Sequence, residues 1–178
     1  DVIVTRSDSD IGDDLRKKIA LFCNVKPDCV ISDVTLDCLY QTPIMLHNNG
    51  LDKVVCRELK LRSKLNLTPW KELIRRINGR KKHVTVALVG KYVKLHDSYL
   101  SVVEALYSAG YENGCYVAIK WVDSEEVTPD TAAEIYKDVD GIIVPGGFGS
   151  RGIEGMIETC RYAREHDLPY FGICLGMQ

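Results

Sequence analysis

One cysteine of this chain lies in a setting typical of a catalytic nucleophile. Cys174 follows the apolar run Leu168–Phe171 and stands between Gly172 and Gly176. This small-x-nucleophile-x-small pattern is typical of a strand that turns sharply into a helix, where glycines relieve crowding around a strained central residue. The turn would lift the thiol clear of the sheet, at a helix start that favours thiolate. The alternative interpretation is a buried cysteine in a glycine-rich loop.

A second glycine-rich turn is expected beside this cysteine. The apolar run 140–144 predicts a buried strand, and it continues into the segment Pro145–Gly152, which contains Gly146 and Gly147. Ligands of open α/β sheets bind at the carboxyl ends of strands, where backbone N–H groups are accessible. Next to a nucleophilic cysteine, such N–H groups can form an oxyanion hole for acyl transfer. The alternative interpretation is a plain tight turn.

Strands and helices alternate through the second half of the chain. Apolar runs predict strands at 83–89, 116–122, 140–144 and 169–173, and helical periodicity predicts helices at 97–110, 129–137 and 153–166. This alternation is typical of an α/β fold with a mostly parallel sheet and flanking helices.

The first half of the chain has shorter elements. We expect strands at 2–4 and 29–31, a helix that ends near Cys23 with Asp13 or Asp14 as its cap, and a short helix that ends at 48–50. The segment 54–82 is basic and amphipathic, and Thr68 is expected to cap the start of a helix within it. No aromatic residues interleave with its charges, which favours a solvated linker over a nucleic-acid surface.

Composition excludes several classes of function. The chain has 178 residues, of which 46% are hydrophobic and 27% charged, and its formal net charge is −2, so there is no electrostatic case for nucleic acid or membrane surfaces. No apolar run is long enough to span a bilayer. The histidines and cysteines show no metal-ligand spacing, so no metal site is predicted. Six cysteines are expected to be small core residues in a reducing cytosol: Cys23, Cys29, Cys38, Cys56, Cys115 and Cys160.

The two glycine motifs together resemble the class I (triad) glutamine amidotransferases, and the chain as a whole resembles the CTP synthase family. The resemblance implies three parts: the end of a Rossmann-like amidoligase domain at 1–55, an interdomain linker at 56–82, and the first half of a flavodoxin-like glutaminase domain at 83–178. The chain opens inside a strand-like run and stops one turn after Cys174. We therefore expect it to be an internal fragment.

The resemblance also implies roles for residues of the second motif. Cys174 matches the nucleophile of a Cys-His-Glu triad, whose histidine and glutamate belong to a later segment of the family. The N–H groups of Leu175 and of Gly147, or its neighbour Gly146, would form the oxyanion hole. The stretch that lines the glutamine site would be Leu175, Gly176, Met177 and Gln178.

In the first part, the resemblance implies contacts to nucleotides. Lys18 matches a lysine that contacts the pyrimidine nucleotide, and Arg6 lies at the same pocket; the alternative for Lys18 is a solvated helix face. Val34, Thr35 and Leu36 fall where the family places backbone contacts to the adenine of ATP. The usual pattern there is Lys-Asp-Val, so a side-chain role at these positions is not expected to carry over.

A member of this family is a cytosolic homotetrameric ligase of pyrimidine biosynthesis. It makes CTP from UTP with ATP, Mg²⁺ and ammonia released from glutamine, with GTP as activator and CTP as inhibitor. The Mg²⁺ ligands would lie outside this chain, and the segment alone is expected to be inactive. Two alternatives stay open: the glutaminase of another class I amidotransferase, such as GMP synthase or carbamoyl phosphate synthase, and a truncated, non-catalytic nucleotide-binding or assembly module.

Overall fold

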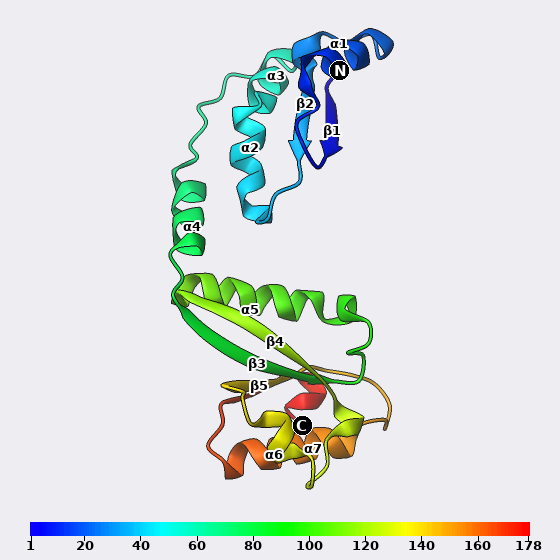
Figure 1. Cartoon of the computed structure of the whole chain (residues 1–178), viewed down its shortest axis with the longest axis vertical. Helices are drawn as coiled ribbons and strands as arrows, with labels where there is room; N and C mark the ends of the chain where they lie inside the picture. Colours follow the sequence, from blue (N-terminus) through cyan, green and yellow to red (C-terminus); the bar gives the residue numbers. More distant parts are fainter. The chain divides into compact units, whose positions relative to one another are not determined.

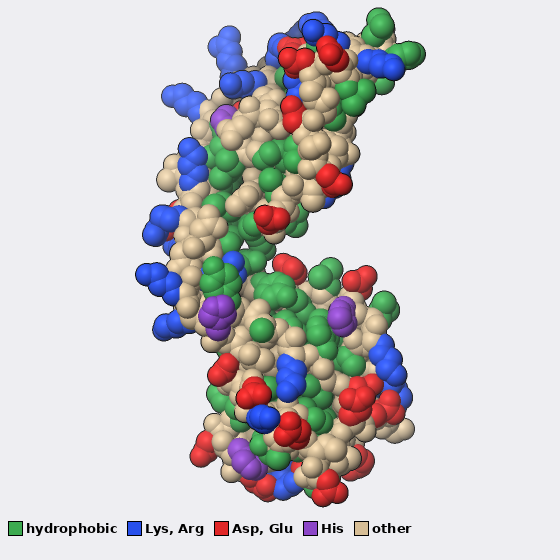
Figure 2. Space-filling view, viewed as in Figure 1, with side chains coloured by type: hydrophobic (Ala, Val, Ile, Leu, Met, Phe, Trp, Pro, Cys, Tyr) green, Lys and Arg blue, Asp and Glu red, His purple; other side chains and the backbone are tan.

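All residues, 1–178, are described in the computed structural model, and they divide into two units, Asp1–Asn78 and Gly79–Gln178. Figure 1 labels the helices and all strands except the last, and Figure 2 shows the side chains in the same view, coloured by type. Each unit has its own parallel sheet. No helix in either unit combines the length and the apolar character needed to cross a bilayer.

The first unit is built on two parallel strands. Strand β1 (Ile3–Ser7) pairs with β2 (Val30–Val34), with Ile3 opposite Val30 and Ser7 opposite Val34. The helices of this unit are α1 (Gly12–Phe22), α2 (Thr42–Asn48), α3 (Leu51–Glu58) and α4 (Thr68–Asn78), with short 3₁₀ turns η1 (Pro27–Cys29) and η2 (Leu39–Gln41). The core of the unit consists of Cys29, Ile31 and Val54, with partly buried apolar side chains around them.

The second unit has a four-stranded sheet. Its strands are β3 (Lys82–Gly90), β4 (Cys115–Asp123), β5 (Gly141–Val144) and β6 (Tyr170–Gly172); its helices are α5 (Leu100–Asn113), α6 (Ala132–Tyr136) and α7 (Ile153–Glu165), with 3₁₀ turns η3 (His96–Tyr99), η4 (Ser124–Glu126) and η5 (Cys174–Gly176). The strand order is β4-β3-β5-β6 and all pairs are parallel. Numbered within the unit, this order is 2-1-3-4, as in the flavodoxin-like order 2-1-3-4-5. The predicted α/β class with parallel sheets and flanking helices is therefore confirmed.

Helices cover both faces of this sheet because successive strand residues point to opposite sides. On one face, Leu88 and Ile143 belong to a buried cluster with Val103 of α5. On the other face, Ala87 and Val144 belong to a cluster with apolar side chains of α6 and α7. Figure 1 shows α5 on one side of the strands and α6 and α7 on the other.

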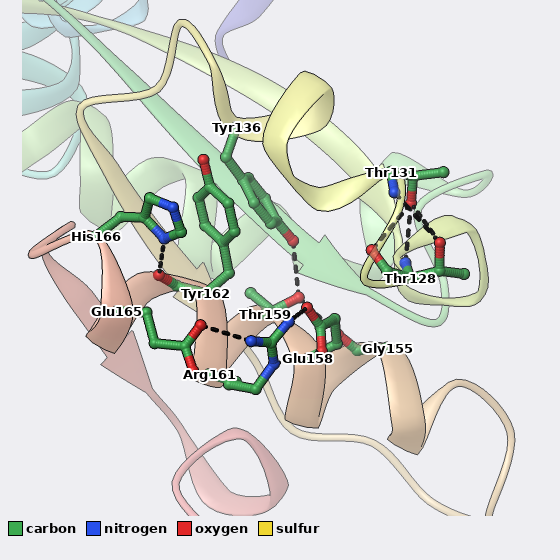
Figure 3. Close-up of polar contacts among 10 residues, drawn as sticks. All are labelled: Thr128, Thr131, Tyr136, Gly155, Glu158, Thr159, Arg161, Tyr162, Glu165 and His166. Atoms are coloured by element: carbon green, nitrogen blue, oxygen red, sulfur yellow. Dashed lines mark hydrogen bonds and ion pairs between the residues drawn. The ribbon is translucent and has the colours of Figure 1, made fainter.

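A buried polar network ties α7 to α6. The Thr159 hydroxyl donates to the Gly155 carbonyl at 2.7 Å, so it accepts from the Tyr136 hydroxyl, also at 2.7 Å (Figure 3). Burial raises the pKa of Tyr136 to about 12, so the phenol remains a donor. Elsewhere on α7, Arg161 Nε donates to Glu158 Oε2 at 2.8 Å, and this contact lowers the pKa of the Glu158 carboxyl.

Two expected helix caps are wrong. Asp13 and Asp14 lie inside the first turn of α1, whose capping residue Ile11 makes no side-chain hydrogen bond. There the acidic side chains act on the helix dipole instead of capping the helix. Helix α4 begins at Thr68 itself, and the Thr68 N–H donates to Asn66 Oδ1 at 3.0 Å. Asn66, two residues earlier, therefore accepts from the first backbone donor of the helix, so Thr68 is a helical residue and not the cap.

The expected burial of six cysteines is also largely wrong. All seven cysteines are free, and of those six only Cys29 is buried, while Cys23 and Cys160 are exposed. Cys23 lies at the end of α1 and Cys160 on α7, and on an amphipathic helix an apolar run in sequence does not decide which side faces the core.

Candidate active site

Cys174 stands at the point where β6 ends and the chain turns. It follows Gly172 by two residues and begins η5, and its φ is 54°, in the left-handed region. For a residue with a Cβ, that conformation costs about 1–2 kcal/mol. The side chain is exposed. The interpretation of a buried cysteine is therefore wrong, and the sharp strand-to-helix turn is present.

The flanking glycines are required by backbone contacts inside this turn. A Cβ added to Gly172 would lie 2.1 Å from the carbonyl oxygen of Gly176. A Cβ added to Gly176 would lie 2.0 Å from the carbonyl oxygen of Val144 at the end of β5. The Ile173 N–H donates to the same Val144 carbonyl at 2.9 Å. The turn is thus packed directly, backbone on backbone, against the ends of β5 and β6.

The second glycine motif lies beside Cys174. A Cβ added to Gly146 would lie 3.2 Å from Cβ and 3.6 Å from Sγ of Cys174. Because Gly146 has no side chain, the loop that follows β5 approaches the thiol with bare backbone. The structure therefore brings together Cys174, Gly146 and the first residues of η5 at the ends of β5 and β6.

Lys91, which the sequence did not indicate as a site residue, contacts this loop through its ammonium group and its aliphatic stem. It follows β3 directly and is 3% exposed. Its Nζ donates to the carbonyls of Gly149 at 2.6 Å and Phe148 at 3.3 Å. Its aliphatic stem packs against Gly147, where an added Cβ would be 3.2 Å from Lys91 Cδ. A lysine at the carboxyl end of an otherwise apolar strand is the signal that could have identified it.

Arg151 fixes the far end of the same loop. Its guanidinium donates to the Lys91 carbonyl at 2.5 Å and to Glu125 Oε2 at 2.7 Å. The hydrogen bond with Glu125 raises the pKa of Arg151 above its usual range, so the guanidinium is charged. The Tyr99 hydroxyl accepts the Lys91 N–H at 3.1 Å. The loop is therefore anchored at its middle and at Arg151 to residues that follow β3 and β4.

A cavity of about 550 Å³ lies on the α7 side of the turn. Its walls include Met156 and Cys160 of α7, the Tyr170 side chain, and the stretch Leu175–Gln178 expected to line the glutamine site. Cys174 and the glycines of the second motif do not line it. We therefore do not assign this cavity as the glutamine site.

The four histidines make their ring contacts away from Cys174. His83 stacks on Tyr116, His96 on Trp121 and His166 on Tyr162, while His47 Nδ1 lies 3.1 Å from Asp52 Oδ1 in the first unit. None of these contacts pairs a histidine with Cys174.

The residues expected at a nucleotide lie on the first unit. Arg6 is opposite Asp33 in the β1–β2 ladder, and their side chains form an ion pair at 3.4 Å. At the ends of the same strands, the Thr35 N–H donates to the Ser7 carbonyl at 3.0 Å, which extends the ladder past Val34. The structure thus brings Arg6, Val34 and Thr35 to one end of the two-stranded sheet.

Leu36 follows directly, and Lys18 belongs to a different element. Lys18 is an exposed residue of α1, and no hydrogen bond or ion pair joins it to Arg6 or to the segment Val34–Leu36. No group of three or more His, Cys, Asp or Glu side chains has the geometry of a metal site.

Two family models match the chain. Residues 1–61 match the model described as CTP synthase N-terminus, and residues 94–178 match glutamine amidotransferase class-I. A CTP synthase of Clostridium acetobutylicum is 51% identical over 100% of this chain and 34% of its own length. A CTP synthase of Clostridium kluyveri is 52% identical over 100% of this chain and 33% of its own length. The chain spans about a third of the length of these curated relatives.

Among solved structures, the glutaminase domain of Trypanosoma brucei CTPS with bound acivicin is similar to this chain. The two sequences are 41% identical, and the match covers 53% of this chain and 38% of the solved chain, with a TM-score of 0.49.

Proposed function

Because the chain belongs to the CTP synthase family, we propose that Cys174 is the nucleophile that releases ammonia from glutamine in a complete CTP synthase. The observation that carries this proposal is the conformation of Cys174: an exposed thiol held at a φ of 54° at the end of a parallel strand. Strain of this kind is maintained only where the surrounding structure imposes it, and here the close backbone packing at Gly172 and Gly176 does so.

The proposed reaction is an acyl transfer. The Cys174 thiolate attacks the side-chain amide carbon of glutamine, and the electron pair of the C=O bond moves onto the oxygen. The N–H groups of Leu175 and of Gly147 or Gly146 bind that oxygen, and losing one such donor raises a barrier by about 3 kcal/mol. The C–N bond then breaks, and ammonia leaves with a proton supplied by a general acid. Water hydrolyses the thioester, which releases glutamate and the thiol.

We propose that the first part of the chain contributes to binding UTP and ATP, including their phosphates. Arg6 and Lys18 offer cationic side chains to a triphosphate, and the backbone of Val34, Thr35 and Leu36 offers peptide groups to adenine. The extents proposed for the three parts are 1–55, 56–82 and 83–178. The match of residues 1–61 to the CTP synthase N-terminus favours this family over another class I amidotransferase.

For the complete enzyme we propose a cytoplasmic homotetramer of pyrimidine biosynthesis. It would use ATP and Mg²⁺ to activate UTP, respond to GTP as activator and CTP as inhibitor, and transfer ammonia to UTP. These proposals rest on the family alone.

The test is Cys174→Ala in the complete enzyme that carries this chain, with CTP formation followed by absorbance. Glutamine-driven CTP formation should fall to background, because the nucleophile is gone. Formation from added ammonium salt should persist, because the thiolate acts only on glutamine. Undiminished glutamine-driven turnover by Cys174→Ala would show that another group is the nucleophile.

A further inference from the structure

A phenol of β6 reaches the turn that carries Cys174. The Tyr170 hydroxyl donates to the Gly176 carbonyl at 2.5 Å. Tyr170 and Gly172 lie on the same face of β6, and the Cα of Gly172 packs against the same Gly176 carbonyl. This carbonyl is therefore held by a hydrogen bond from one β6 residue and by close packing against the other.

The hydrogen bond at Gly176 is the first of a short series. The Gly176 carbonyl and the Met177 N–H belong to one peptide group, and the Met177 N–H donates to the Cys174 carbonyl at 3.0 Å. The Cys174 carbonyl and the Leu175 N–H belong to the next peptide group in the series. A trans peptide is planar, and its C=O and N–H point in opposite directions. Fixing the Cys174 carbonyl therefore fixes the direction of the Leu175 N–H.

We propose that Tyr170 is a positioning residue of the glutaminase site, which orients and polarises the Leu175 N–H through the peptide groups of Gly176 and Cys174. This inference rests on the proposed function, in which the Leu175 N–H binds the oxyanion. Hydrogen bonds in series polarise one another, so a donor at one end makes the N–H at the other end a stronger donor. In this role Tyr170 acts only through these peptide groups.

The surroundings of Tyr170 suit this role. Its ring packs with Leu175 against the buried cluster between the sheet and α7, which holds the hydroxyl in one place. Burial raises the pKa of Tyr170, so the phenol stays protonated at neutral pH and keeps its donor. Phenylalanine would fill the same space and lack only the hydrogen bond.

The experiment is Tyr170→Phe in the complete enzyme, with ammonia-driven CTP formation by the same preparation as the internal standard for folded protein. Relative to that standard, kcat with glutamine should fall about 5- to 10-fold, the effect of one lost hydrogen bond. KM for glutamine should change less than twofold, because an oxyanion donor acts mainly in the transition state. Replacing Tyr170 by 4-aminophenylalanine keeps a donor at the same place and should restore most of the loss.

Two tyrosines of the same unit are matched controls, and both are labelled in Figure 3. Tyr136→Phe removes the buried hydrogen bond to Thr159, so it lowers stability without touching the turn. Tyr162→Phe removes the hydroxyl of a tyrosine whose ring packs against the same cluster. Both should keep kcat and KM for glutamine.

The outcomes separate this inference from the proposed function. If Cys174→Ala abolishes glutamine use and Tyr170→Phe leaves kcat unchanged, the positioning role is refuted and the nucleophile stands. A rise in KM alone, an equal loss in Tyr136→Phe, or no rescue by 4-aminophenylalanine would each overturn the positioning role. If Cys174→Ala retains glutamine use, the proposed function itself fails.

Discussion

Adding one methyl group at Gly176 tests whether the turn around Cys174 is held in one geometry. In Gly176→Ala the new Cβ would lie 2.0 Å from the Val144 carbonyl oxygen and 2.9 Å from the Val144 Cβ. Carbon and oxygen atoms that are not bonded do not approach below about 3.0 Å. The turn must therefore move by about 1 Å, and β5 cannot yield because Val144 is fully buried.

The expected consequence is a large kinetic loss with a moderate loss of stability. A displacement of about 1 Å in a catalytic constellation can cost about 100-fold in rate, so we expect glutamine-driven turnover to fall by at least that factor. Overpacking of this kind typically destabilises a fold by about 1–3 kcal/mol. Most of the protein should therefore stay folded while the glutaminase reaction is lost.

The assay measures glutamine-driven and ammonia-driven CTP formation in the same preparation of the complete enzyme. Gly141→Ala is the matched control, because its added Cβ would meet nothing closer than the Pro169 carbonyl oxygen at 3.5 Å, an ordinary contact. Gly141→Ala should keep the ratio of the two rates. A Gly176→Ala enzyme with a normal ratio would refute the claim that the turn packs rigidly against β5.

Three further outcomes are expected. Cys174→Gly should be more stable to denaturant than Cys174→Ala by about 1 kcal/mol, because only glycine relieves the left-handed φ; equal stabilities would show that no strain is stored there. Tyr136→Phe should lower the free energy of unfolding by about 1 kcal/mol, since the Thr159 hydroxyl loses its donor, and a thermal melt unchanged by the substitution would contradict this. The contact with Arg161 lowers the pKa of Glu158, so the ionised pair stabilises the folded state above the usual carboxyl pKa, and this stability is lost as pH falls through the lowered pKa. Glu158→Gln should therefore make the thermal melting temperature less sensitive to acid, and an unaltered pH profile would count against the pair.

Periodicity was sufficient to predict most elements of the second unit. The expected strands at 83–89, 116–122 and 140–144 and the helix at 153–166 agree with β3, β4, β5 and α7 to within a residue or two. Strands that are buried on both faces are continuous apolar runs, so their limits are visible in the sequence. In the first unit, the sequence does not predict α3 (Leu51–Glu58) as a separate helix, because the basic composition that indicates a linker begins within it.

Motif spacing located the turn because its constraint is local. Cys174, Gly172 and Gly176 lie within five positions of one another, and each glycine is required by a backbone contact that any such turn must make. The residues that hold the turn and its neighbouring loop could not be found in this way.

Lys91 reaches the carbonyls of Phe148 and Gly149 across more than fifty residues of sequence, and only the parallel pairing of β3 with β5 brings them together. Tyr170 is nearer in sequence, but in a strand whose neighbours are apolar its ring is indistinguishable from a core side chain. The hydroxyl acquires a role only because η5 folds back and places the Gly176 carbonyl over the same face of β6. A candidate nucleophile can thus be located from its own short motif, whereas the groups proposed to position it depend on the strand order, which places distant residues at the same edge of the sheet.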